Sequence, residues 1–180
     1  MFKIGGHVTH QELAQEIYRI AHLKGDFLLR SGQRSNEYFD KYRFESNPKV
    51  LKEIAKHLAP KIPKGTEILA ALEMGGIPIG TALSLETGIP CAFVRKKAKD
   101  YGTCKFAEGP DIKEKQVTII EDVITSGGQV LLSTADLREM GAIVNNVLCV
   151  IHRGVDNAEN KLQGAGLKLT PLFKRDDFPT

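Results

Sequence analysis

Short apolar runs alternate along the chain with segments in which apolar residues recur every three or four positions. The runs are typical of strands buried on both faces, and the periodic segments are typical of helices with one apolar side. Strands are predicted at residues 68–72, 89–94, 117–120, 143–151 and 167–172. Because helical segments separate these strands, the pattern predicts a doubly wound, mainly parallel α/β sheet flanked by helices, with its functional loops at the carboxyl ends of the strands.

Capping residues mark where the predicted helices begin. Thr9 and Glu12 form a capping-box pair, and helical spacing follows them until Gly25. Asn47 and Pro48 are typical of the first positions of a second helix. Further helices are predicted at residues 79–85, 129–140 and 157–162, and two short extended pieces at residues 27–29 and 38–39.

A chain of 180 residues is long enough to fold without metal or disulfide support, so residues 1–180 are predicted to be one domain. About residues 1–45 would form a small N-terminal hood subdomain. Residues 95–116 are too polar to be core and are predicted to be a flexible loop. No apolar run approaches the ~20 residues of a membrane span, and the N-terminus lacks an apolar signal core. The protein is therefore expected in the cytoplasm and not in a membrane.

Charge and cysteine content exclude further classes of partner. The formal net charge of +3 is too small to indicate a nucleic-acid partner. Cys91, Cys104 and Cys149 are odd in number and lack CxxC spacing. They therefore indicate neither a disulfide framework nor a zinc site.

The stretch VTIIEDVITSGGQ at residues 117–129 carries the most distinctive chemistry. An apolar strand is followed by Glu121 and Asp122, whose carboxylates can accept hydrogen bonds from hydroxyl groups. A turn of small residues then precedes a helix that opens at Gln129, where free backbone N–H groups attract an anion. A sugar phosphate suits this stretch, because its hydroxyls can bind the two acids and its phosphate can bind the turn before the helix. The simpler interpretation is an ordinary strand-turn-helix crossover, but two adjacent acids at the end of a buried strand are costly to desolvate without a ligand.

This stretch closely resembles the signature of the type I phosphoribosyltransferases. The resemblance implies that Glu121 and Asp122 hold the ribose hydroxyls of 5-phosphoribosyl 1-pyrophosphate, with Asp122 in a catalytic role. It also implies that the loop after the acids holds the 5′-phosphate of this donor. The matching loop residues are Val123, Ile124, Thr125, Ser126, Gly127, Gly128 and Gln129.

A basic segment lies between two predicted strands, where Arg95, Lys96, Lys97 and Lys99 fall within five residues and Tyr101 follows. It resembles the start of the mobile catalytic loop of orotate phosphoribosyltransferases. The resemblance implies that Arg95, Lys96 and Lys99 bind the donor, with Lys99 catalytic, because cations must neutralise the departing pyrophosphate. Tyr101 stands where that family usually has a histidine, so a titratable cation is missing there. A solvated basic loop is the competing interpretation.

A second strand, glycine turn and helix occur at residues 68–85, around Glu73-Met74-Gly75-Gly76. In the resembled family this turn contacts pyrophosphate, which suits glycines because they let backbone N–H groups approach closely. Many bacterial orotate enzymes have a lysine where Gly75 stands. Any such contact here must come from the backbone or from another side chain.

The segment GDFLLRSGQRSNEYFD also resembles the N-terminal part of the orotate enzymes, in which a basic residue at the position of Arg30 approaches the donor. Arg153, after the strand at residues 143–151, and Thr125 match residues that contact orotate in that family. A planar guanidinium suits the orotate carboxylate, whereas the competing interpretation of Arg153 is a surface residue at the end of the sheet. The resemblance further implies Mg²⁺ without direct protein ligands, and a homodimer in which the basic loop crosses to the neighbouring subunit.

The resulting hypothesis is an orotate phosphoribosyltransferase that makes orotidine 5′-monophosphate and pyrophosphate in pyrimidine synthesis. A purine-base phosphoribosyltransferase is the nearest rival, although it has no need for a cation opposite a base carboxylate. A non-catalytic regulator of the same fold, which would sense the donor without releasing pyrophosphate, is the rival from another class. Product formation with a panel of bases separates the three.

Overall fold

The computed structural model describes residues 8–28, 32–97, 106–154 and 157–178. Its centre is a six-stranded sheet with the order β5-β4-β3-β6-β7-β8, in which β5 is antiparallel to β4 and the other neighbours are parallel. The strands are β3 (Ile68–Leu72), β4 (Cys91–Val94), β5 (Ala107–Glu108), β6 (Gln116–Ile124), β7 (Ile143–His152) and β8 (Lys168–Lys174). The predicted doubly wound, mainly parallel sheet is thus confirmed.

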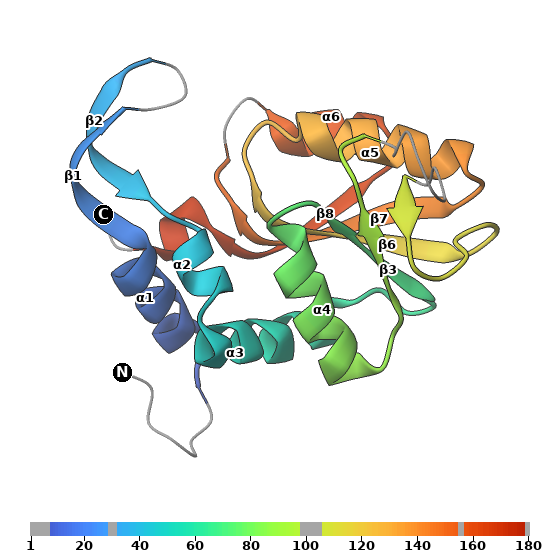
Figure 1. Cartoon of the computed structure of the whole chain (residues 1–180), viewed down its shortest axis with the longest axis horizontal. Helices are drawn as coiled ribbons and strands as arrows, with labels where there is room; N and C mark the ends of the chain where they lie inside the picture. The colour runs from blue at the N-terminus through green and yellow to red at the C-terminus, as the bar shows by residue number, and fades with distance from the viewer. Residues whose placement is uncertain (1–7, 29–31, 98–105, 155–156, 179–180) are drawn as a thin grey trace.

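Helices cover both faces of this sheet, and each face has its own apolar core (Figure 1). One face packs against the helices α1 (His10–Ala21), α3 (Pro48–Leu58) and α4 (Gly76–Thr87). The other face packs against α5 (Gly128–Glu139) and α6 (Ala158–Gly164). Burial on both sides explains why β3 consists entirely of apolar residues, all five of them buried.

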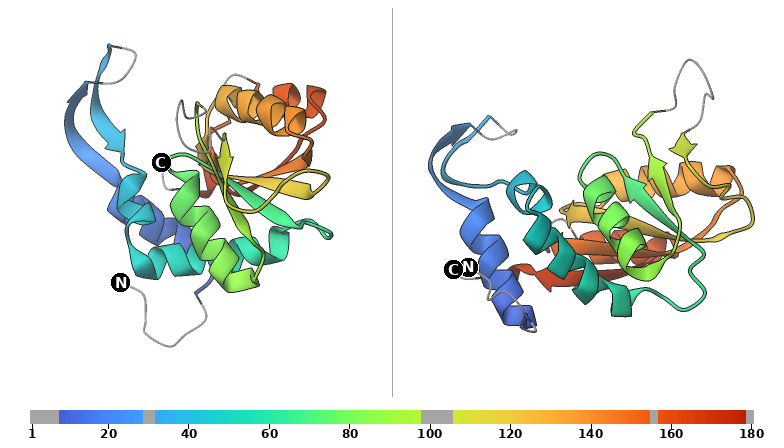
Figure 2. Two further views of the ribbon diagram at one scale, coloured as in Figure 1. Left: turned by 45° about the vertical axis from the view of Figure 1, so that its right-hand side comes forward. Right: turned by 60° about the horizontal axis from the view of Figure 1, so that its bottom comes forward.

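The N-terminal region adds a two-stranded antiparallel hairpin of β1 (His22–Leu28) and β2 (Arg34–Phe39), followed by the short helix α2 (Tyr42–Glu45). Figure 2 shows the hairpin projecting from the body of the molecule. The capping box at Thr9 is confirmed, but the prediction that helix α1 continues to Gly25 is wrong. The chain leaves the helix after Ala21, whose carbonyl accepts the Asp40 N–H, and the glycine falls where the pairing register shifts within the hairpin.

The polar segment at residues 95–116 is also more ordered in its second half than its composition suggests. Ala107 is 5% exposed and Ile112 is 3% exposed, and both belong to the apolar core under α5 and α6. Phe106 packs against the same core. The prediction that this segment is too polar to be core is therefore wrong for these residues, because a few apolar side chains among many polar ones are enough to attach an edge strand.

Strand β3 is the branch point of the sheet, because the chain moves to β4 on one side of it and later to β6 on the other. The turns after β3 and β6 therefore lie next to each other at a topological switch point, where open α/β sheets bind their ligands. Both glycine-rich turns singled out in the sequence lie here. Within the described residues, no helix is long and apolar enough to cross a membrane.

Two further helices differ slightly from their predicted bounds. Helix α4 begins at Gly76, three residues before the predicted start, and α5 begins at Gly128. Each helix therefore opens directly from its glycine turn. The backbone N–H groups of the first helical residues consequently face the switch point.

Candidate active site

Strand β6 continues through both acids of the signature instead of ending before them. Glu121 pairs in register with Cys149, and Ile124 pairs with His152 at the end of β7. The predicted end at Ile120 is thus too early by four residues. A polar pair does not stop a strand when its parallel neighbour continues to offer backbone partners. The acids are consequently held by the sheet and not by a loop.

Asp122 is the most enclosed polar group of the site, at 1% exposure. Its Oδ2 forms an ion pair with the Nζ of Lys41, and its Oδ1 accepts the Val123 N–H. Burial alone would raise the pKa of Asp122, but the neighbouring Glu45, Glu121 and Lys41 side chains outweigh burial and hold the pKa below its usual value. Asp122 is therefore a charged acceptor in the absence of ligands.

Two more carboxyl groups lie beside Asp122 and behave differently. Burial, followed by the adjacent Asp122 charge, raises the pKa of Glu121 to about 9. Burial and the same neighbour raise the pKa of Glu45 to about 8, and among the residues that the structure describes neither oxygen of Glu45 has a hydrogen-bond partner. Both shifts favour the protonated forms of Glu121 and Glu45, so the negative charge of the three carboxyl groups is concentrated on Asp122.

Glu45→Gln is expected to change how stability depends on pH. In the folded chain the Glu45 pKa of about 8 lies above the ordinary value of 4.5. The free energy of unfolding of the wild type therefore falls as the pH rises from about 4.5 to about 8, because the buried carboxyl must then lose its proton. Glutamine carries no charge at any of these pH values, so the variant does not lose this stability. Thermal unfolding should show the variant gaining about 2–4 kcal/mol relative to wild type between about pH 5 and about pH 9.

The matched control for this measurement is Glu86→Gln, which removes an exposed glutamate on α4. It should show no comparable gain at high pH. If both variants follow the wild-type pH profile, Glu45 does not hold a proton in the folded protein.

The turn after β6 has the form expected of a phosphate-binding loop. Gly127 has φ 76°, a left-handed conformation that favours glycine, and it precedes the first residue of α5. The first turn of α5 has no acidic residue and no side-chain cap, so its N–H groups are open to an anion. Thr125 is exposed beside them. The side chain of Gln129 donates to Ser133, so this residue offers the turn its backbone only.

The turn after β3 lies directly against Asp122. A Cβ atom at Gly75 would be 1.5 Å from Asp122 Oδ2, so a side chain at this position, a lysine included, would require the Asp122 carboxylate to move. The neighbouring Glu73 carboxylate accepts the backbone N–H of Lys96, which joins this turn to the start of the basic segment. The departure from the family pattern at Gly75 thus has a steric cause in this chain.

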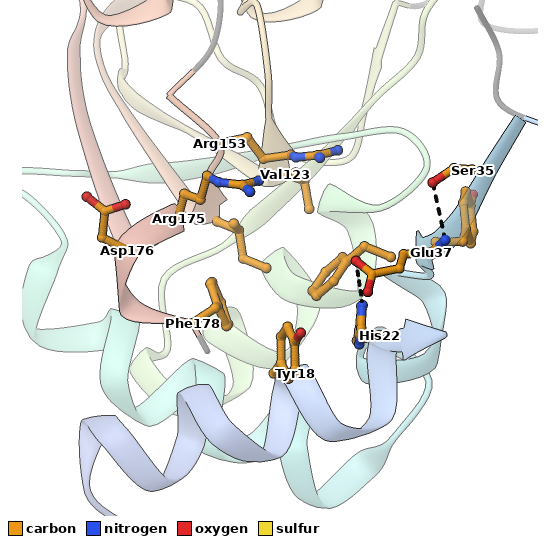
Figure 3. Close-up of a pocket in the computed structure, with 12 residues that line it drawn as sticks. Tyr18, His22, Ser35, Glu37, Val123, Arg153, Arg175, Asp176 and Phe178 are labelled. Carbon is orange, nitrogen blue, oxygen red and sulfur yellow. Dashed lines mark hydrogen bonds and ion pairs between the residues drawn. The ribbon is translucent and has the colours of Figure 1, made fainter. Parts of the chain in front are cut away.

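A pocket of about 530 Å³ lies between the hairpin, the ends of β6 and β7, and the C-terminal segment (Figure 3). Arg153 and Arg175 both extend into it, and within the described residues neither side chain has an ion-pair or hydrogen-bond partner. The Arg153 N–H donates to the Ile124 carbonyl at 2.9 Å, which fixes this residue beside the end of β6, as predicted. The aromatic lining consists of Tyr18, Tyr38, Phe39 and Phe178. Two unpaired cations among aromatic rings suit a flat anionic ligand.

The described part of the basic segment, residues 95–97, does not line this pocket. Arg95 forms an ion pair with Glu108 at 3.6 Å, and Lys96 lines a separate hollow against the end of α5 with Asp136 and Glu139. The candidates Lys99 and Tyr101 lie outside the described residues, as does Arg30. Their predicted roles stay predictions.

Three functional candidates were missed in the sequence, namely Lys41, Glu45 and Arg175. Lys41 and Glu45 lie in a charged stretch that reads as solvent-exposed helix, and their burial depends on how α2 meets β6. Arg175 follows β8, so its position at a strand's carboxyl end was the signal that could have identified it.

Comparison with known proteins agrees with this geometry. No protein-family model matches the chain. The chain is 48% identical over 166 residues to the orotate phosphoribosyltransferase of a Nocardioides species, covering 92% of each chain. It is 40% identical over 154 residues to that of Methanocella arvoryzae, covering 86% of this chain and 87% of the relative.

Among solved structures, the crystal structure of Mycobacterium tuberculosis H37Rv orotate phosphoribosyltransferase in complex with Fe(III) dicitrate is 25% identical in sequence. The two structures superpose with a TM-score of 0.82, covering 93% of this chain and 97% of the other. Similarity at the level of the curated relatives, over nearly the whole chain, establishes descent as well as fold. The chain belongs to the orotate phosphoribosyltransferase family.

Proposed function

We propose that this protein transfers the phosphoribosyl group of 5-phosphoribosyl 1-pyrophosphate to orotate, releasing pyrophosphate and forming orotidine 5′-monophosphate for pyrimidine synthesis. The observation that carries the proposal is the arrangement at the switch point. There a charged Asp122, an anion-binding turn and an arginine-lined pocket follow one another along the end of β6. These three features match the ribose, phosphate and base of the product.

The donor is held by the two halves of the signature. Asp122 accepts a ribose hydroxyl, and Glu121 beside it accepts a second one. The backbone from Val123 to Gln129, together with the Thr125 and Ser126 hydroxyls, binds the 5′-phosphate at the start of α5. As the bond from C1′ to pyrophosphate stretches, the sugar gains positive charge, and the carboxylate beneath it stabilises that charge.

The residues present fit Mg²⁺. This ion keeps several waters and binds through one or two carboxylates together with substrate phosphates. Asp122 supplies one such carboxylate, and Glu121 lies beside it. When bound, the ion would neutralise the pyrophosphate, with the two acids reaching it through water or the ribose hydroxyls.

The leaving pyrophosphate also needs cations from the protein, and we assign Arg95, Lys96 and Lys99 to this role, with Tyr101 as a neutral hydrogen-bonding group beside them. Lys96 lies in a hollow away from the pocket of Arg153. This separation supports a homodimer in which the basic segment serves the neighbouring subunit. Mixing Lys99→Ala with Asp122→Asn subunits should then restore about one intact site per heterodimer, and a mixture without recovery would argue against exchange of the segment.

We assign the base to the pocket that contains Arg153, with Thr125 as a second contact. Pyrophosphate release and nucleotide formation should be measured with orotate, adenine, guanine and xanthine. Turnover of orotate alone supports the proposal, whereas turnover of a purine without orotate makes the protein a purine enzyme. Binding of the donor without release of pyrophosphate, whichever base is added, would make the protein a sensor.

The free thiols of Cys91 and Cys149 agree with a cytoplasmic enzyme.

A further inference from the structure

Lys41 reaches the buried carboxylate of Asp122 from the open side of the site. It lies just before α2, and its Nζ pairs with Asp122 Oδ2. The lysine side chain is 34% exposed, whereas that of Asp122 is 1% exposed. The amine therefore lies at the boundary between solvent and the deepest charge of the donor site.

The same oxygen also faces the turn after β3. A Cβ at Gly75 would be 1.5 Å from Asp122 Oδ2, so this oxygen lies between the lysine amine and the backbone of that turn. Within the described residues, Lys41 is the only cation that forms an ion pair with Asp122. Gly75 has no side chain that could take this role, and with Asp122 in its present position there is no room for one.

The carboxyl groups around Asp122 make this cation necessary. Glu45 is 4% exposed, and within the described residues neither of its oxygens has a hydrogen-bond partner. Glu121, next to Asp122, is the third carboxyl group of the site. Three carboxyl groups in a buried site repel one another when ionised, and a buried charge without a partner is costly. Lys41 is the positive charge that faces this group of carboxyls within the described residues, and it pairs with Asp122.

Binding of the donor changes the partners of this amine. The ribose hydroxyls would compete with the amine for the Asp122 carboxylate, to which the amine is paired in the absence of ligand. The nearest new negative charge is the pyrophosphate, because it is attached to C1′, next to the hydroxyl on C2′. The turn expected to hold the pyrophosphate touches the same Oδ2, so a side chain already at this oxygen needs only a small rotation to reach it.

We propose that Lys41 is a donor-binding residue that neutralises Asp122 in the empty enzyme and transfers its amine to the pyrophosphate when the ribose occupies Asp122. This inference rests on the proposed function, since it presupposes that the donor is bound here. It assigns to a residue of the N-terminal region a cationic contact that the turn after β3, with a glycine at position 75, does not provide.

The first test compares Lys41→Met, which keeps the length of the side chain, with Lys41→Arg, which keeps the charge. Lys41→Met should raise the KM for the donor about tenfold to 100-fold and leave the KM for orotate within about twofold, because only a charge-assisted contact to the donor is lost. Lys41→Arg should recover most of the affinity. Lys56→Ala removes a comparable lysine–glutamate pair at 2.7 Å on α3 and should change neither constant.

The second test measures the affinity for inorganic pyrophosphate with Mg²⁺ by calorimetry, and it stays informative if Lys41→Met alone folds poorly. Asp122→Asn frees the amine and should bind pyrophosphate at least as tightly as wild type. The double variant Lys41→Met/Asp122→Asn leaves no unpaired carboxylate and should bind about tenfold more weakly than Asp122→Asn. Equal affinities of these two variants would overturn the proposal.

These outcomes separate the inference from the function on which it rests. Formation of orotidine 5′-monophosphate by wild type tests the function and does not depend on Lys41. If wild type is active and Lys41→Met keeps the wild-type KM for the donor, the function stands and the role of Lys41 is wrong. If wild type is inactive with orotate, the function fails whatever the variants show.

Discussion

Asp122→Asn is expected to lower kcat/KM for the donor by about 10²–10³-fold while the protein stays folded. The asparagine keeps the volume of the side chain but replaces a charged acceptor by a neutral one. The lost interaction is strongest in the transition state, when the sugar is most positive, so kcat should fall more than affinity for the donor. The fold should survive because the Lys41 side chain is 34% exposed and can turn its amine to water.

Steady-state kinetics at saturating orotate, together with thermal unfolding, measures this effect. Glu121→Gln should act in the same direction, because Glu121 accepts the second ribose hydroxyl. Glu86→Gln on α4 is the control and should leave the kinetics unchanged. If Asp122→Asn and Glu121→Gln both keep the wild-type efficiency for the donor, the acids do not hold the ribose.

The fold was largely predictable because the apolar pattern and the burial of the strands have the same physical cause. The five residues of β3 are buried on both faces and were predicted with the correct bounds. The caps at Thr9 and Asn47 form as expected, since the hydrogen bonds involved are local. Errors arose where a distant partner decides the structure. Strand β6 passes through its acids because β7 continues beside it, and Ala107 joins the core because β4 offers it an edge.

The candidate site was predictable in its local part only. The signature residues lie in one continuous stretch, so their proximity follows from the sequence. The Arg153 backbone was expected beside the end of β6 because β6 and β7 were expected to be neighbours, and its N–H does bond to Ile124. Lys41 and Glu45 come from a region more than 70 residues away in the chain, and only the packing of α2 brings them to Asp122. The steric role of Gly75 likewise depends on the contact between two strand ends.

Arg153→Ala should raise the KM for orotate about 10²-fold and leave that for the donor nearly unchanged. Orotate carries a carboxylate that uracil lacks, and a guanidinium can pair with it through two parallel charge-assisted hydrogen bonds. Arg153 has no ion-pair partner within the described residues, so its charge is available to a ligand in the pocket. Arg153→Lys should lose about tenfold, because an ammonium group cannot match the planar pairing.

Arg175 provides the sharpest comparison, since it extends into the same pocket and has no ion-pair partner in the described part of the chain. Only Arg153 is fixed by its backbone beside the β6 end that carries Thr125, so Arg153→Ala should impair orotate use more than Arg175→Ala does. Arg19→Ala, at an exposed arginine of α1, controls for the loss of a surface cation. Uracil should be a poor substrate of wild type and lose little further in Arg153→Ala, because the missing carboxylate and the missing guanidinium remove the same interaction. Equal losses for orotate and uracil, or a defect confined to the donor, would place Arg153 outside the base site.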